Sequence, residues 1–293
     1  MTPANSVITL TFGDQAENHV GMEKLGTMVD PGEGFQMSDF HYILLKFENL
    51  NTEPELYNLS TLSNDKNETE NEETKPEAYL LVIRNGVNII LNDLGLDQNI
   101  YNDQMLFQEQ ANLNVDKKAF MYGRVVNKHA RWNLCFDQYS REPDYQNGKG
   151  RIIAFDDLPI TSKLIQSFPT YFGEKTLNLK GEGNYYFDKK ICGIGFHGDS
   201  ERRKVLAIRL GTSLNIHYQW FKNGKPVGNR IIVPLNGGDI YIMSEKAVGT
   251  DWKKKIYIYI KTRYWIRQIY YYQLEKTKQT KLTYSQISLN FNY

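Results

Sequence analysis

Short runs of alternating apolar and polar residues recur between residues 177 and 243, and this pattern predicts a succession of β-strands. Turn sequences such as Asn223-Gly224 separate the runs. Strands at this regular spacing are typical of a sandwich or barrel. The predicted strands are 181–187, 193–197, 205–210, 216–221, 230–234 and 240–243.

The chain before residue 177 reads as a mixture of strands and helices. Residues 6–12 and 120–136 are strand-like, and residues 93–111 are compatible with a helix. Asp157 and Pro159 are a helix-start signal, so we predict a helix within 156–171. In residues 78–91, the Asn85-Gly86 pair between apolar runs favours a hairpin, although a helix also fits the pattern.

Changes in composition divide the chain into regions. Residues 62–76 are rich in Asn, Glu and Thr and poor in large apolar groups, which predicts a disordered polar insertion. The regions expected are an N-terminal β-containing region (1–61), this insertion (62–76), a helical and strand support region (77–176), a core (177–255) and an atypical C-terminal tail (256–293).

The tail has an unusual composition. It is dominated by Ile, Tyr, Lys, Gln and Thr and contains no Gly, Pro, Asp, Ala, Val or His. Two interpretations fit this composition. The tail replaces the native C-terminus, or it is a genuine β-rich end, as the alternation at 256–260 indicates.

Overall composition narrows the class of protein. With a net charge of +1, the chain has no overall electrostatic field that would attract nucleic acid or a membrane surface. The two cysteines, Cys135 and Cys192, indicate a reducing, intracellular location in the cytoplasm or nucleus. No signal peptide and no apolar stretch of membrane-spanning length is evident, so no membrane association is expected.

His197-Gly198-Asp199 is the most informative motif. Side chains two residues apart on a strand point to the same face, so this segment supplies two ligands of a 2-His-1-carboxylate iron site. Asn184 and Tyr186 share a face of the preceding strand in the same way, and we expect them to line the same cavity.

The order of these motifs resembles that of the AlkB-like iron(II)/2-oxoglutarate dioxygenases. An Asn-x-Tyr strand is followed by His-x-Asp, a strand ending in Leu210-Gly211, an aromatic strand, and Gly238-Asp239 before Met243-Ser244. The resemblance covers about residues 130–255. It implies an α+β fold with a double-stranded β-helix (jelly-roll) core and an N-terminal α/β extension. It also implies hydroxylation or oxidative demethylation, with Fe(II) as cofactor and 2-oxoglutarate as cosubstrate.

The resemblance implies roles for individual residues. His197 and Asp199 correspond to iron ligands, and Asn184 and Tyr186 to side chains that bind 2-oxoglutarate. The second His expected near 247–255 is missing, and Asp251 is the nearest residue able to bind iron. The cosubstrate arginine is expected further on, where Arg263 and Arg267 are candidates by position. His217 comes too early in the chain and is interpreted as structural.

Two alternatives follow from these departures. The chain is a catalytically inactive protein that uses the oxygenase fold for binding, or it is a truncated or altered version of an active enzyme. The substrate is not readable from the sequence. Nucleic acid stays open, since basic residues adjoin an aromatic one at Lys128, Arg131 and Trp132, and further basic residues occur at 202–204. An edge strand explains the first segment equally well, and a solvated turn is the commoner explanation of the second.

Overall fold

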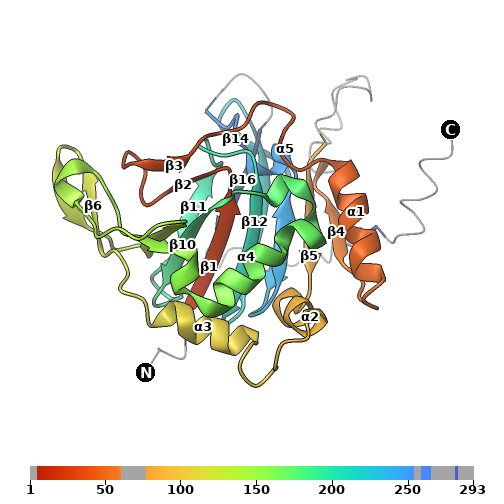
Figure 1. Cartoon of the computed structure of the whole chain (residues 1–293). Helices are drawn as coiled ribbons and strands as arrows, with labels where there is room; N and C mark the ends of the chain where they lie inside the picture. The colour runs from red at the N-terminus through yellow and green to blue at the C-terminus, as the bar shows by residue number, and fades with distance from the viewer. Residues whose placement is uncertain (1–4, 61–76, 254–258, 265–280, 283–293) are drawn as a thin grey trace.

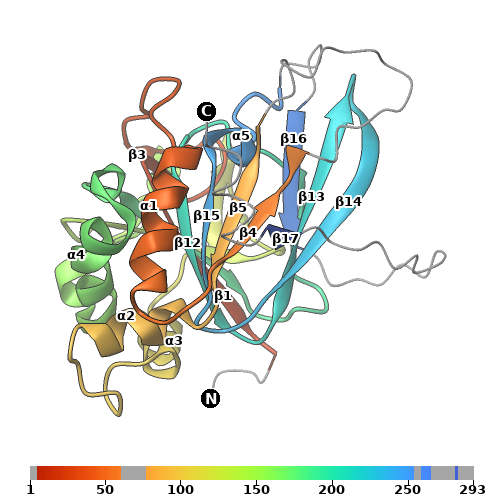
Figure 2. The same ribbon diagram turned by 90° about the vertical axis from the view of Figure 1, so that its right-hand side faces the viewer.

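The computed structural model describes residues 5–60, 77–253, 259–264 and 281–282. Its elements form three layers. Figure 2 shows the helices α1 to α4 on one side of a large sheet and the strands β13, β14 and β16 on the other. The predicted insertion at 62–76 and most of the tail, including Arg267, lie outside the described residues.

The large sheet contains nine strands among the described residues, in the order β17-β4-β5-β15-β12-β1-β10-β8-β9. Its strand pairs are antiparallel except for β8 and β9, which are parallel. The strands are β1 (Val7–Gly13), β4 (Glu55–Asn58), β5 (Tyr79–Ile83), β8 (Trp132–Asp137), β9 (Ile152–Ala154), β10 (Lys180–Tyr186), β12 (Val205–Gly211), β15 (Ile240–Met243) and β17 (Lys281–Leu282).

A second sheet of four strands lies against the large one, in the order β11-β16-β13-β14. Its strands are β11 (Ile194–His197), β13 (Leu214–Lys222), β14 (Lys225–Leu235) and β16 (Tyr259–Tyr264). Two further antiparallel pairs are β2 (Gln15–Glu17) with β3 (Lys24–Gly26) and β6 (Lys118–Met121) with β7 (Arg124–Asn127). The strands predicted between residues 181 and 243 are therefore confirmed, with ends shifted by a few residues.

Helices α1 to α4 pack on the outer face of the large sheet (Figure 1), whereas the buried residues of α5, Ala247 and Val248, belong to the core between the sheets. Pro159 stands in the first turn of α4, as the helix-start signal predicted. In the part of the chain that the structure describes, no helix is both long and apolar enough to cross a membrane. The α-helices are α1 (Met37–Glu48), α2 (Gly86–Asp93), α3 (Asp103–Ala111), α4 (Pro159–Phe172) and α5 (Glu245–Val248), and the 3₁₀ turns are η3 (Tyr145–Asn147), η4 (Phe155–Asp157) and η5 (Glu174–Thr176).

Alternation along the strands of the large sheet produces two cores. On β1, Ile8 and Leu10 face the helices, whereas Val7 faces the smaller sheet. The core between the sheets is richer in tyrosine, and within it the indole nitrogen of Trp220 donates a hydrogen bond of 2.7 Å to the Leu59 carbonyl. Because the inner faces of both sheets are buried, polar side chains on these faces require a specific explanation.

Segments from the N-terminal region and from the tail belong to the two sheets. β1 lies in the middle of the large sheet, between β10 and β12. β16, from the tail, lies between β11 and β13. Residues 259–264 therefore behave as the β-rich end that was one of the two interpretations of the tail. The Asn85-Gly86 pair opens helix α2 rather than a hairpin, with Asn85 in the left-handed conformation at φ 54°.

Candidate functional site

His197 and Asp199 come together at the end of strand β11. The Nε2 atom of His197 lies 3.4 Å from the Oδ1 atom of Asp199, and the side chains are 26% and 21% exposed. His197 is the register partner of Thr262, which is buried on β16, so the His197 side chain is directed inward. The pair is therefore partly open to solvent at the margin of the space between the sheets.

The ring of His197 has a defined orientation. Its Nδ1 atom lies 2.9 Å from the carbonyl oxygen of Gly195. A carbonyl can only accept, so Nδ1 carries the proton in this hydrogen bond. In a neutral imidazole, Nε2 then presents a lone pair toward the carboxylate of Asp199. Two acceptors at this distance are stabilised by a cation or a proton between them, and a backbone partner on the far nitrogen is typical of metal-binding histidines.

Asp199 is also tied to a buried charge network. Its Oδ2 atom forms an ion pair of 3.3 Å with Nε of Arg202, whose side chain is 3% exposed. Arg202 pairs in addition with Glu182 and Glu201. Burial raises the pKa of Asp199, but neighbouring positive charge, chiefly that of Arg202, outweighs it and holds the pKa below its usual value. Asp199 is therefore anionic, as a metal ligand must be.

Asn184 belongs to the same network through Glu182. Its amide nitrogen donates to Glu182 Oε1 at 2.9 Å. Its amide oxygen accepts from Nε of Arg131 at 2.6 Å and from the Asn133 amide at 2.9 Å. The amide nitrogen is the atom of Asn184 that can donate to a carboxylate, and Glu182 uses one of its two N–H groups. Tyr186, the second predicted cosubstrate residue, is buried between the sheets.

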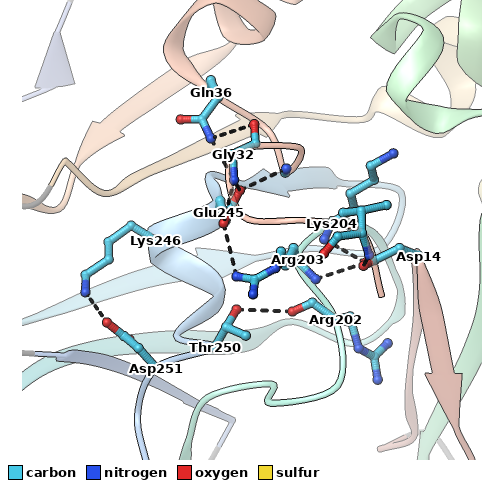
Figure 3. Close-up of polar contacts among 12 residues, drawn as sticks. Asp14, Gly32, Gln36, Arg202, Arg203, Lys204, Glu245, Lys246, Thr250 and Asp251 are labelled. Atoms are coloured by element: carbon cyan, nitrogen blue, oxygen red, sulfur yellow. Dashed lines mark hydrogen bonds and ion pairs between the residues drawn. The ribbon is translucent and has the colours of Figure 1, made fainter. Parts of the chain in front are cut away.

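The loop after Asp199 is anchored to α5 and to the N-terminal segment (Figure 3). Glu245 accepts hydrogen bonds from the backbone of Gly32 and Gly34 and forms an ion pair with Arg203. Asp14 accepts from the backbone nitrogens of Arg203 and Lys204, both at 2.9 Å. Arg203 and Lys204 thus fix the position of the loop that carries the His-x-Asp motif.

The segment that follows α5 holds the same loop from the other side. The backbone nitrogen of Asp199 donates to the Val248 carbonyl at 3.1 Å, and the Thr250 hydroxyl donates to the Arg202 carbonyl at 3.2 Å. The segment after α5 therefore supports the His-x-Asp segment directly.

Asp251 is paired within this supporting segment. Its carboxylate forms an ion pair with Lys246, as Figure 3 shows. Within residues 5–60, 77–253, 259–264 and 281–282, no group of three His, Cys, Asp or Glu side chains is arranged to hold a metal ion. The structure therefore does not bring Asp251 together with His197 and Asp199 as a three-ligand group.

Arg263 lies on the opposite side of the small sheet from Tyr186. Along β16, Ile260 and Tyr264 contribute to the core between the sheets, so the alternate residue Arg263 faces outward. Its guanidinium lies 4.5 Å from the ring centroid of Phe196. Arg263 does not reach the position predicted for a cosubstrate arginine, because the alternation of side chains along β16 directs it outward. His217 lies on β13 and is the register partner of Arg263 on β16. The next residue on β13, Tyr218, faces the core between the sheets.

One arginine that sequence reasoning missed does face the space between the sheets. Arg209 on β12 is fully buried, and its guanidinium lies 4.8 Å from the ring centroid of Tyr264 on the opposing sheet. Tyr264 in turn makes a hydroxyl–hydroxyl contact of 2.5 Å with Tyr241. A single Arg inside the apolar strand Val205–Gly211 was the available signal, since an unpaired charge is rarely buried.

The basic and aromatic residues considered for nucleic acid are engaged within the protein. Lys128 is buried, and its Nζ atom donates to Asn18 and Asn133. Burial lowers the pKa of Lys128 to about 8. The ring of Trp132 stacks on Phe187 with centroids 4.2 Å apart. These contacts agree with the structural interpretation of the segment.

The fold defines a mixed α/β protein with a large, mostly antiparallel sheet. No protein-family profile matches the chain. An uncharacterised protein of Acanthamoeba polyphaga mimivirus is 46% identical over 257 residues, which span 87% of this chain and 94% of the viral protein. The chain belongs to the same family as this viral protein. The description of the viral protein gives no activity, so the chemistry has to be argued from the site.

Proposed function

We propose that this protein is an AlkB-like iron(II)- and 2-oxoglutarate-dependent dioxygenase with a double-stranded β-helix core. The two facing sheets and the His-x-Asp motif at their margin support the proposal. The observation that carries it is the pair of His197 Nε2 and Asp199 Oδ1, two potential ligand atoms 3.4 Å apart at a partly open strand end. Such a pair suits a divalent cation better than it suits the apolar core.

Each residue of the site would have its own role in this function. His197 and Asp199 would hold iron(II), and Gly195 would orient the imidazole through its carbonyl. When bound, iron(II) supplies the oxygen-activating chemistry that couples oxidation of a substrate C–H bond to decarboxylation of 2-oxoglutarate. Arg202 keeps Asp199 ionised, and the anchored loop between β11 and β12 keeps both ligands in position.

A second candidate function follows from a specific observation. The described residues provide two protein ligands and no three-ligand group. A site of two ligands binds iron weakly, so a non-catalytic binding protein that retains the oxygenase fold is the alternative. Both candidates use the same His197–Asp199 pair but differ in turnover.

Succinate release from 2-oxoglutarate in the presence of Fe(II) and oxygen separates the two candidates. For the oxygenase, we expect slow succinate release that requires Fe(II) and is lost in His197→Ala. For the binding protein, the unmodified chain releases no succinate although it binds the metal. Release that is unchanged in His197→Ala would refute the proposed site, because the chemistry would then occur elsewhere.

A further inference from the structure

A row of aromatic rings lies on the outer face of the small sheet, together with cationic side chains. The ring centroids of Phe196 and Phe221 lie 5.7 Å apart, and those of Phe221 and Tyr259 lie 5.8 Å apart. Lys261 and Arg263 alternate along β16 with residues of the core between the sheets, so both side chains lie on the outer face. This sheet forms the side of the molecule opposite the helices α1 to α4 (Figure 2).

Three cations from two strands contact these rings. The guanidinium carbon of Arg263 lies 4.5 Å from the ring centroid of Phe196, and that of Arg230, on β14, lies 5.2 Å from the same centroid. The ammonium nitrogen of Lys261 lies 4.8 Å from the ring centroid of Phe221. Contacts between a cation and an aromatic ring restrict a long side chain, so these three charges form an ordered array.

None of the three cations has a carboxylate partner among the described residues. Arg230, Lys261 and Arg263 form no ion pair there, and the buried Nε atom of Arg263 has no hydrogen-bond partner there either. Burial and the positive charge of Arg230 lower the pKa of Arg263, and burial lowers the pKa of Lys261. Because like charges without a counterion repel one another, an anionic partner would stabilise this face.

The array suits an extended acidic peptide better than a nucleic acid. Lys261 and Arg263 are two residues apart on a strand, which separates their α-carbons by about 6.6 Å. Alternate residues of an extended peptide have the same spacing, so acidic side chains at every second position would match it. Single-stranded nucleic acid binds by stacking its bases on open aromatic faces, whereas here the protein's own cations lie over the rings.

The array adjoins the segment that carries the His-x-Asp motif. Phe196 directly precedes His197 in the sequence. The ammonium nitrogen of Lys261 also lies 4.7 Å from the ring centroid of Trp252, and a β-carbon on Gly198 would lie 2.8 Å from Cδ1 of Trp252. A partner on this face would therefore lie behind the strand end that carries the His197–Asp199 pair.

We propose that the outer face of the small sheet, at Arg230, Lys261 and Arg263, is a docking surface for an extended acidic segment of a partner protein. Each guanidinium fork matches one carboxylate in bidentate geometry, and the Lys261 ammonium pairs with a third as a point charge. Docking requires neither iron nor turnover, so this surface is independent of the proposed function.

The test is binding of a fluorescent alternating Glu–Ser peptide to the full chain, measured by fluorescence anisotropy at low ionic strength. We expect saturable binding that weakens about tenfold in Arg263→Gln and about threefold in the exposed Arg230→Gln, because each variant loses one charged pair. Arg124→Gln, a matched change at an exposed arginine on β7, should leave the affinity unchanged. Circular dichroism establishes that each variant is folded, and Arg230→Gln decides the matter if Arg263→Gln does not fold.

Two further probes make the result specific. An alternating Gln–Ser peptide is the uncharged control and should not bind. An oligothymidylate of the same net charge should bind more weakly than the acidic peptide, and equal or tighter binding would assign this face to nucleic acid instead. Absence of acidic-peptide binding to the unmodified chain would overturn the proposal, as would unchanged affinity in both Arg230→Gln and Arg263→Gln. We expect His197→Ala to bind the peptide normally, so a failure of the proposed function would leave this surface standing.

Discussion

Gly198 packs directly against Gly249. A β-carbon on Gly198 would lie 2.1 Å from the Gly249 carbonyl oxygen. Gly249 itself has a positive φ of 74° and ends helix α5. The central residue of His197-Gly198-Asp199 thus allows the motif to approach the segment after α5 as closely as the Asp199–Val248 hydrogen bond requires.

Gly198→Ala should therefore displace the His-x-Asp segment. Because the clash is with backbone, we expect a loss of at least about 1–3 kcal/mol in the free energy of unfolding. Urea denaturation measures this loss. Gly195→Ala is the matched control, since its β-carbon would meet nothing within 4 Å. Equal stability of the two variants would contradict the close packing of Gly198 on Gly249.

Glu245→Gln should loosen the loop that follows Asp199. The carboxylate of Glu245 accepts from Gly32 and Gly34 and pairs with Arg203, and the amide cannot reproduce these charged contacts. We expect a loss of about 1–2 kcal/mol in the free energy of unfolding, measured in urea. Glu33→Gln, at an exposed position beside the same turn, should change stability little. A comparable loss in both variants would argue against a specific role for Glu245.

Lys128 should make the free energy of unfolding rise with pH. Its pKa is about 8 in the folded protein against an ordinary value of 10.5, so the unfolded chain binds more protons between these values. The stability that Lys128 contributes is fully present above the pKa of Lys128 in the unfolded chain, and it is lost as the pH falls through about 8. Between pH 7.5 and 9.5, it should grow by about 2 kcal/mol.

The readout is the difference between the unmodified chain and Lys128→Met, measured by urea denaturation at each pH. Burial raises the pKa of the Cys135 thiol, which lowers stability in alkali in both proteins, and this effect largely cancels in the difference. A difference that is independent of pH would show that Lys128 is not buried as a cation among Asn18 and Asn133.

The strands of both sheets were predictable because their signal is local. Alternation and turn residues located β10 to β15, and Pro159 marked the start of α4. Two helices show the limits of this approach. The Asn85-Gly86 pair is a hairpin signal, but the left-handed Asn85 starts α2, whose Ile90 and Leu91 pack under the large sheet. For α1, the buried residues Phe40, Ile43, Leu44 and Phe47 have helical spacing that our sequence interpretation did not use.

The candidate site was only partly predictable, because partners come from distant segments. Strand periodicity predicted that His197 and Asp199 lie together, and they do, although β11 ends at His197 and Asp199 lies just beyond it. The outward direction of Arg263 depends on the register of β16, which residue 263 does not reveal by itself. Arg209 was visible as a lone charge in an apolar strand, but only the structure shows that its guanidinium has no partner among the described residues.

The most direct test of the central claim is an anaerobic calorimetric titration of the full chain with Fe(II) or Mn(II). The account predicts weak binding of one ion, lost in His197→Ala and retained in the outward-facing variant Arg263→Met. Tight binding that survives His197→Ala would contradict the account, since the metal would then be held by other residues.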